Sequence, residues 1–351
     1  MSAEQVSGWA PDVLGEPFEQ LTLPLGEDSE GPVVATLVRA RGRSLFGGLF
    51  GRRGPLRDVD VLYVHGWSDY FFQRDLAQFW TDRGADFYAL DLRKYGRSIR
   101  PGQTPGYITD LAAYDEDIAA ALGAMGWDPA AGREGRRLVL FGHSTGGLVL
   151  SLWAARHPGL VSAVVLNSPW LEFQLSAVAR AAVAPVVGLQ ARLRPRDEFP
   201  QIDLGFYARA QREAAGTDLG VNAEWRPEQA MPVHAAWLNA VLAGHAQVAA
   251  GLHIDAPVCV LLSTKSAVPT RWSDELTRAD TVLVVDEIAR AALKLGESVT
   301  IERIPGALHD VFLSRADARE IAYARLGRWV GGCLGAARRA EPSDSARIPA
   351  E

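Results

Sequence analysis

Residues 137–150, RLVLFGHSTGGLVL, decide the fold of this chain. An apolar strand runs into the turn Gly142-His143-Ser144-Thr145-Gly146-Gly147, and an apolar helix follows at once. This arrangement is typical of a nucleophile elbow, in which a sharp and strained turn exposes the serine hydroxyl. The turn leaves no space for bulky neighbours, and glycines flank Ser144 at the positions that need to be small. Ser144 is therefore the candidate nucleophile, and acyl transfer is the expected chemistry.

The same glycine-rich turn could instead hold a phosphate, with Ser144 only capping the helix. A phosphate-binding loop needs a lysine beside the serine, or the dinucleotide glycine spacing followed by an acid. Neither follows the strand residues Val139-Leu140-Phe141. The pattern favours the nucleophile.

The composition is that of a globular protein. The 351 residues are 48% hydrophobic, enough for one large α/β core with an inserted subdomain. The net charge of -6, with no basic clusters carrying interleaved aromatic residues, argues against a nucleic-acid partner. Residues 1–17 have neither a positive start nor an apolar centre, which predicts no signal peptide and a cytoplasmic location. Cys259 and Cys333 lie in apolar segments and are expected to be two buried thiols.

Strands and helices alternate along most of the chain. Besides the strand before Ser144, strands are expected at 33–40, 59–64, 86–92, 160–170, 257–263 and 298–304, and helices at 71–84, 109–125 and about 317–334. This order predicts an α/β fold with a mostly parallel, doubly wound sheet of about eight strands. In the helix at 109–125, Thr109 or Asp110 is the expected cap. Leu111, Tyr114, Ile118 and Leu122 share one face there, and Asp115, Glu116 and Asp117 are expected to face solvent.

Prolines break residues 171–252 into several helices, which predicts a helical cap inserted into the sheet domain. The expected division is a core from 1–170 and 253–339, the cap at 171–252 and a polar tail at 340–351. Segment 175–190 of the cap, LSAVARAAVAPVVGLQ, offers aliphatic surface for an acyl chain, although a helix packed on its own core has the same pattern. The Arg- and Gly-rich loop 41–55 could touch a membrane or an acyl substrate, but a hairpin tip is favoured.

A serine hydroxyl needs a base, and the base needs an acid that fixes its tautomer. His309 follows the last predicted strand, so its loop lies at the same sheet edge as Ser144 and makes it the favoured base. The other six histidines have structural explanations, and no pair has convincing metal spacing, so neither a metal nor a cofactor is expected.

Asp280 is the favoured acid, because it preserves the chain order Ser, Asp, His, and Asp274 and Asp286 are the alternatives. The loop after the strand at 59–64, His65-Gly66-Trp67, is expected to give the second oxyanion donor. The predicted donors are the backbone amides of Trp67 and Thr145, and the Trp67 side chain is expected to wall the acyl pocket.

Several segments together resemble the α/β-hydrolase superfamily, in particular its monoglyceride lipase and serine aminopeptidase-like branch, often described as lysophospholipase. The matching segments are VLYVHGW (61–67), YALDLRKYGRS (88–98), GYITDLAAYDEDIAA (106–120), GHSTGG (142–147), ADTVLVVDEIA (279–289) and GALHDVF (306–312). The resemblance implies Ser144, Asp280 and His309 as the triad, with oxyanion amides from Trp67 and Thr145. The chain departs from this branch at Thr145, at Lys94-Tyr95 and in the inserted segment 263–278.

The leading functional hypothesis is a serine hydrolase that cleaves carboxylic esters of apolar acyl groups through an acyl-enzyme, with a small ester as its partner. A peptidase or amidase acting on short substrates is the alternative, with Glu213, Glu224 or Glu228 holding the amino terminus of the substrate. A noncatalytic binding protein that keeps the fold is the third hypothesis, and the complete Ser, His and acid set disfavours it.

Overall fold

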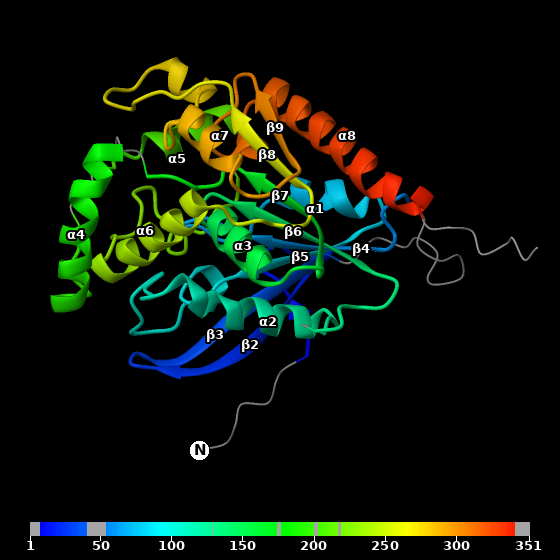
Figure 1. Ribbon diagram of the computed structural model, residues 1–351, viewed down its shortest axis with the longest axis horizontal. Helices are drawn as coiled ribbons and strands as arrows, with labels where there is room; N and C mark the ends of the chain where they lie inside the picture. Colours follow the sequence, from blue (N-terminus) through cyan, green and yellow to red (C-terminus); the bar gives the residue numbers. More distant parts are fainter. Residues whose placement is uncertain are drawn as a thin grey trace, which may run out of the picture.

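The central feature of the molecule is a nine-stranded sheet that is parallel over most of its width. The computed structural model describes residues 8–40, 54–128, 130–173, 177–199, 203–216 and 219–340. The strands follow the order β1-β2-β3-β5-β4-β6-β7-β8-β9 (Figure 1). Strands β4 to β9 pair in parallel, whereas β1, β2 and β3 form an antiparallel edge. The bounds are β1 Ala10–Pro11, β2 Phe18–Asp28, β3 Gly31–Ala40, β4 Val59–Val64, β5 Asp86–Asp91, β6 Arg137–His143, β7 Val161–Asn167, β8 Val258–Ser263 and β9 Val299–Ile304.

All seven strands expected from the sequence are present, but the hydrophobic pattern does not predict β2. Phe18, Leu21 and Leu23 of this strand are buried. Pro24 and Gly26 then interrupt the alternation, and the pairing with β3 shifts register between Pro24 and Glu27. Pairing with β3, rather than a local pattern, therefore makes this segment a strand.

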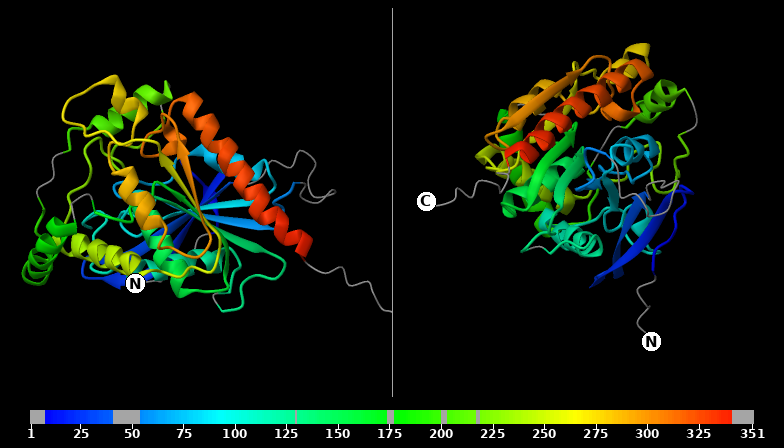
Figure 2. Two further views of the ribbon diagram at one scale, coloured as in Figure 1. Left: turned by 45° about the horizontal axis from the view of Figure 1, so that its top comes forward. Right: turned by 90° about the vertical axis from the view of Figure 1, so that its right-hand side faces the viewer.

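Helices cover both faces of the sheet, which confirms the predicted doubly wound α/β class. Helices α1 and α8 pack on one face of the sheet (Figure 2). Trp80, Phe141 and Leu326 belong to the core between these helices and the sheet. Helices α2, α3 and α7 pack on the other face. The bounds are α1 Arg74–Thr81, α2 Tyr114–Ala124, α3 Thr145–Arg156, α4 Ala177–Leu193, α5 Phe206–Ala215, α6 Ala235–Ala250, α7 Val285–Ala292 and α8 Ala316–Ala340, with short 3-10 turns η1 Gly96–Ser98, η2 Leu111–Ala113, η3 Asp274–Arg278 and η4 Val311–Leu313.

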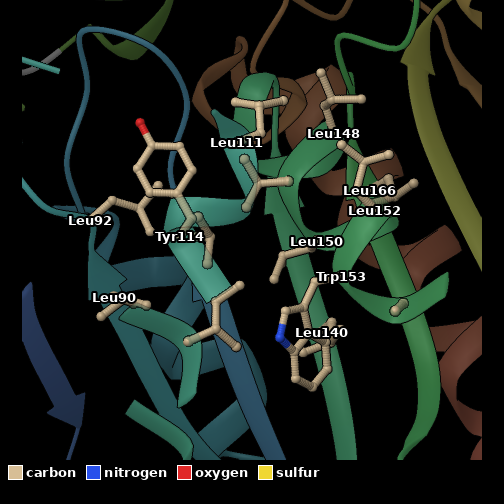
Figure 3. Close-up of a cluster of buried hydrophobic side chains, with 14 of the residues drawn as sticks. Leu90, Leu92, Leu111, Tyr114, Leu140, Leu148, Leu150, Leu152, Trp153 and Leu166 are labelled. Atoms are coloured by element: carbon tan, nitrogen blue, oxygen red, sulfur yellow. The ribbon is translucent and has the colours of Figure 1, made fainter. Parts of the chain in front are cut away.

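The core against α2 and α3 contains the predicted apolar face of the segment 109–125. Figure 3 shows Leu111 and Tyr114 of this segment beside leucines of α3 and of the strands, and all are buried. Asp110 caps the η2 turn by accepting a hydrogen bond from the Ala112 amide at 2.9 Å. Contiguous burial on both faces explains why the central parallel strands are apolar along their whole length.

The prediction that Asp117 faces solvent is wrong. Its side chain is fully buried and accepts hydrogen bonds from the backbone amide and the Nε of Arg93, both at 2.7 Å. The acid run at 115–117 looks like a solvated helix face in sequence. Arg93, 24 residues away on the loop after β5, pairs with Asp117, and this one of the three carboxylates is therefore buried.

Residues 171–252 leave the sheet after β7 and return before β8, and we call them the insertion. They contain α4, α5 and α6, and α4 and α6 pack together at one side of the molecule (Figure 1). Helix α6 lies directly against α3, since a Cβ on Gly244 would lie 2.9 Å from Leu111 and 3.1 Å from Leu152. In α4, Val187 is buried, whereas Val186 and Leu189 are 62% and 60% exposed.

Helix α8 extends past the predicted end near residue 334 and includes the first residue of the predicted tail, Ala340. The rest of the tail and residues 41–53 of the Arg- and Gly-rich loop lie outside the described residues. Cys259 is buried and free, whereas Cys333 is free and only partly buried near the end of α8. Within the described ranges, no helix combines the length and apolar character needed to cross a membrane.

Removing core volume from β6 is expected to destabilise the protein. Leu140 is fully buried, so Leu140→Ala should lower the free energy of unfolding by about 2–5 kcal/mol through lost burial and a residual cavity. Leu293→Ala is the matched control, because this leucine is 64% exposed, and its effect should stay within about 0.5 kcal/mol. Urea unfolding followed by circular dichroism measures both, and equal losses would contradict the assigned core.

Candidate active site

Ser144 occupies a strained turn between β6 and α3. Its backbone angles are φ 51° and ψ -118°, a region that L-residues rarely adopt and that costs on the order of 1–3 kcal/mol. The Ser144 amide donates to the Asn167 carbonyl at the end of β7 at 3.0 Å. The Ser144 carbonyl accepts from the Trp170 amide at 2.9 Å, at the start of the chain that leads into the insertion. The end of β7 and the segment that follows it therefore hold the turn through both backbone groups of Ser144.

Glycines at the elbow permit close contact between α3 and the strands. A Cβ on Gly146 would lie 2.3 Å from the His65 carbonyl oxygen, and one on Gly142 would lie 2.6 Å from the Cα of Gly147. Real Cβ atoms do not approach other atoms so closely, and the obstructing atoms are backbone atoms that have no rotamer to change. The first turn of α3 thus lies directly on the end of β4.

His309 and Asp280 meet at the same edge of the sheet. His309 follows β9, and its Nδ1 donates to Asp280 Oδ2 at 3.0 Å. Both side chains are buried. The other carboxylate oxygen, Asp280 Oδ1, accepts from the amides of Val282 and Leu283, each at 2.8 Å. Two backbone donors and the imidazole therefore fix the carboxylate, which in turn fixes the imidazole tautomer.

The two alternative acids lie elsewhere. Asp286 is in the first turn of α7, where its side chain is 68% exposed and pairs with Arg303 at 2.5 Å. Asp274 begins the η3 turn and is exposed. The inserted segment 263–278 precedes Asp280 without displacing it, because the Asp280 amide donates to the Lys265 carbonyl at 3.0 Å. Of the three candidates, the structure brings Asp280 to His309.

His143 connects the elbow with the base. Its ring centroid lies 5.0 Å from that of His309, and it directly precedes Ser144 in the chain. Its Nδ1 donates to the Asn167 carbonyl at 3.1 Å. Burial lowers the pKa of His143, against the charge of Asp310, so this ring is neutral near pH 7. The residue that directly precedes Ser144 therefore packs against the ring of His309.

Sequence reasoning missed a buried polar cluster behind His309. Asp310 is almost completely buried and accepts from Asn167 Nδ2 at 2.8 Å and from Gln73 Nε2 at 2.5 Å. Its backbone amide donates to the Tyr207 hydroxyl of α5 at 3.2 Å. The carboxylate beside His309 in the sequence was the one available signal, whereas Gln73, Asn167 and Tyr207 come from three distant segments.

The loop from 65 to 73, which we call the β4–α1 loop, lies against the elbow. A Cβ on Gly66 would lie 3.0 Å from the Cβ of Ser144. His65 shapes this turn, because its Nε2 accepts from the Leu92 amide at 3.1 Å and its Nδ1 donates to the Gly66 carbonyl at 2.7 Å. Trp67 follows at once, and Thr145 follows Ser144. Thr145 is the first residue of α3, so its amide has no partner within the helix.

Of the two residues that depart from the family pattern, Tyr95 packs on this loop and Lys94 pairs with the β2–β3 hairpin. Tyr95 packs edge-on against His65, with centroids 5.0 Å apart, and against Trp67, 5.8 Å apart. Lys94 is buried and pairs with Asp28 at 2.5 Å and Glu30 at 2.6 Å, at the end of the β2–β3 hairpin. The Lys94-Tyr95 pair therefore has a structural explanation in this chain.

An aromatic cluster lies next to the elbow and combines core and insertion residues. The ring centroids of Trp67 and Trp237 are 3.8 Å apart, and those of Trp170 and Trp237 are 6.0 Å apart. Trp237 belongs to α6 of the insertion and is buried. The predicted acyl wall at Trp67 thus has two further indole rings beside it.

The acids considered for binding a substrate amino terminus are exposed. Glu213 pairs with Arg209 at 2.8 Å, and Glu228 pairs with Arg212 at 2.6 Å. Glu224 also lies at the surface. Arginines on α5 satisfy the charges of the first two, so neither Glu213 nor Glu228 is left as an unpaired carboxylate beside Ser144.

Comparison with known proteins places the chain among hydrolases. A family model described as "Serine aminopeptidase, S33" matches residues 57–315. A curated protein of Mycolicibacterium smegmatis, "Monoacylglycerol lipase", is 28% identical over 262 residues, which cover 72% of this chain and 81% of that protein.

Solved structures share the fold. A monoacylglycerol lipase of Paleococcus ferrophilus has a TM-score of 0.58 at 19% identity and covers 80% of this chain and 96% of its own. A soluble variant of the Saccharomyces cerevisiae monoglyceride lipase, solved with a substrate analogue, has a TM-score of 0.60 at 16% identity and covers 89% and 96%. These similarities confirm the α/β-hydrolase fold with its monoglyceride lipase-like resemblance.

A methyl group at the elbow is expected to disrupt the packing of α3. Gly146→Ala should lower the free energy of unfolding by about 1–3 kcal/mol or more, because the new Cβ meets backbone oxygens of Val64 and His65. Gly123→Ala is the matched control within α2, where a Cβ meets nothing within 4 Å, and should stabilise by about 0.5–1 kcal/mol. Chemical denaturation measures both, and a neutral Gly146→Ala would refute the close approach.

Proposed function

Since this chain belongs to the hydrolase family described as serine aminopeptidase, S33, we propose that it is a serine hydrolase that cleaves carboxylic esters of apolar acyl groups. Ser144 is the nucleophile, His309 the general base and Asp280 the acid that orients it. The amides of Trp67 and Thr145 form the oxyanion hole. The observation that carries the proposal is the buried contact of His309 with Asp280 at 3.0 Å, beside a serine held at φ 51°.

The proposed reaction has two halves. His309 Nε2 takes the Ser144 proton while Oγ attacks the ester carbonyl carbon, and the two amides stabilise the oxyanion that develops. Collapse of this intermediate breaks the bond to the leaving alcohol, which receives the proton from His309. Water, deprotonated by His309, then attacks the acyl carbon. The bond to Ser144 Oγ breaks, His309 returns the proton to Oγ, and the carboxylic acid is released. The bond from Nδ1 to Asp280 keeps Nε2 free to accept the proton and stabilises the imidazolium.

The surroundings of Ser144 support an ester with an apolar acyl group and a polar alcohol. The three indole rings of Trp67, Trp170 and Trp237 give an apolar surface. Within the described residues, the indole nitrogens of Trp67 and Trp170 and the Thr145 hydroxyl are buried without a hydrogen-bond partner. Donors of this kind beside an apolar wall suit hydroxyl groups next to the ester, as in a glycerol monoester. The relative called monoacylglycerol lipase favours the same substrate class.

Amide hydrolysis on short substrates is the alternative, and membership of the family described as serine aminopeptidase, S33, favours it. It would require an acid that binds the substrate amino terminus. The exposure of Glu213, Glu224 and Glu228 disfavours those three for that role. The ester proposal is therefore the stronger of the two.

The domain division and the cellular location stay predictions. We propose that the insertion is a cap over the acyl site and that residues before 171 and from 253 to 339 form one core. A cytoplasmic location and the lack of a nucleic-acid partner rest on the sequence patterns alone, whereas a small ester as partner is also favoured by the relative called monoacylglycerol lipase.

Ser144→Ala is expected to lower kcat on p-nitrophenyl esters by at least about 10³-fold, because the nucleophile is lost. A series of esters from short to long acyl chains, assayed with both proteins, measures this effect, and the optimum reports the size of the pocket. Equal activity in the variant would sink the serine mechanism. Hydrolysis of short peptide amides but no ester by the native protein would favour the alternative.

Replacing the proposed acid tests the assignment among the three candidates. Asp280→Asn should lower kcat by roughly 10³–10⁴-fold, because an amide no longer favours the required His309 tautomer. Asp286→Asn is the matched control on the next helix and should leave kcat within about twofold, since its side chain is exposed. Steady-state kinetics on one ester compares them. A large effect of Asp286→Asn together with a small one of Asp280→Asn would reverse the assignment.

A further inference from the structure

Two loops that carry proposed catalytic groups touch the same part of the insertion. The β4–α1 loop holds the Trp67 amide, and the loop from 305 to 310, which we call the β9–η4 loop, holds His309. Between them lie side chains of α5 and of the segment that follows it. The insertion therefore contacts both loops that carry proposed catalytic groups.

A buried ion pair joins the insertion to the β4–α1 loop. Arg226 Nε lies 2.7 Å from Asp69 Oδ1, and the two side chains are only 12% and 6% exposed. Burial disfavours the charge of Arg226, but Asp69, Tyr207 and Asp310 outweigh it and hold the pKa of Arg226 above its usual value. The guanidinium therefore stays charged near neutral pH, in contact with the β4–α1 loop.

The polar chain continues from Arg226 to the β9–η4 loop. Arg226 Nη2 donates to Gln211 Oε1 at 2.7 Å, and Gln211 Nε2 donates to the Tyr207 hydroxyl at 2.7 Å. That hydroxyl also accepts from the Asp310 amide at 3.2 Å, and the Tyr207 ring packs edge-on against His309 with centroids 5.6 Å apart. Three insertion side chains thus connect Asp69 with the residue next to the base.

Further contacts fix the same region. The Met231 amide donates to Ser68 Oγ at 3.1 Å, and the Asn222 amide donates to the Tyr70 hydroxyl at 2.8 Å. Ser68 itself has a φ of 52°, so the chain immediately after Trp67 adopts a conformation that needs outside support. The insertion supplies that support through the amides of Met231 and Asn222.

We propose that Arg226, Gln211 and Tyr207 are positioning residues, a brace through which the insertion holds the oxyanion donor of Trp67 and the base His309 in register. The inference rests on the proposed function. An oxyanion donor stabilises the transition state only when its distance is held to within a fraction of an ångström, and a shift of about 1 Å costs on the order of 100-fold in rate. A charged group that contacts two buried partners through different nitrogens holds such geometry better than apolar packing does.

The test compares brace variants by kcat, KM and the inhibition constant of an aryl trifluoromethyl ketone. The ketone carbon accepts Ser144 Oγ, the proton passes to His309, and the resulting oxyanion occupies the oxyanion hole, so its affinity reports transition-state geometry. Rates are divided by the concentration of active sites, which is titrated with a fluorophosphonate. Unfolded protein therefore does not lower the measured kcat. The variants are Arg226→Met, Arg226→Lys and Tyr207→Phe. Arg212→Met, whose partner Glu228 is 68% exposed, is the matched control in α5.

Arg226→Met is expected to lower kcat about 10- to 100-fold and to raise the inhibition constant by a similar factor, with KM changed less than threefold. Arg226→Lys should recover part of the loss, and Tyr207→Phe should show the same pattern at about 3- to 10-fold. Arg212→Met should match the native protein. Arg226→Met leaves Asp69 without its ion-pair partner, whereas Tyr207→Phe leaves no buried charge unpaired. If Arg226→Met does not fold, the comparison of Tyr207→Phe with the native protein is the test.

A double variant adds a second criterion. Asp69→Asn combined with Arg226→Met should lose no more activity than the worse single variant, because both act on one contact. Unchanged kcat in the brace variants, or a rise of KM alone, would overturn the proposal while the native protein stays active. Absence of ester hydrolysis and of ketone binding in the native protein would instead overturn the proposed function.

Discussion

The close contact between α3 and the end of β4 is the constraint on which the candidate site depends. Gly146 lets the first turn of α3 approach the carbonyls of Val64 and His65 within distances that no side chain allows. The strained turn at Ser144 persists because this packing surrounds it. The hydrogen bond from the Ser144 amide to the Asn167 carbonyl further restricts the backbone of the turn. Burial of apolar surface in the two cores stabilises the fold that contains the turn. The free-energy cost of the strained backbone is small compared with this gain.

The same contact brings the other groups into reach. Because the parallel strands end at one edge, the loops after β4 and β9 reach the elbow that follows β6, and Asp280 on the loop after β8 reaches His309. The polar groups there are buried, and neighbours on other segments satisfy most of them. Asp310 illustrates this, with partners from α5, from β7 and from the β4–α1 loop. A site assembled in this way depends on the whole sheet rather than on any one loop.

The sequence predicted well those features that local patterns encode. The elbow turn, the seven main strands and the apolar face of the segment 109–125 all follow from short motifs and from chain order. The same reasoning names Ser144, His309 and Asp280, whose catalytic roles stay proposals. The missed features are contacts over long separations. Strand β2 forms through pairing with β3, Asp117 turns inward to meet Arg93, and the partners of Asp310 lie up to 237 residues away. No periodicity carries such information, because each depends on where two distant segments meet.

The ion pair of Asp69 and Arg226 bears on how such a protein changes its substrate range. If the insertion only covered a pocket, it could be exchanged among relatives as a module, with the chemistry left intact in the core. Here Arg226 of the insertion pairs with Asp69 on the loop after β4. An insertion taken from a relative that lacks this arginine would leave Asp69 without its partner. Variation in the insertion and in the β4–α1 loop is therefore expected to proceed together, as a linked pair of changes.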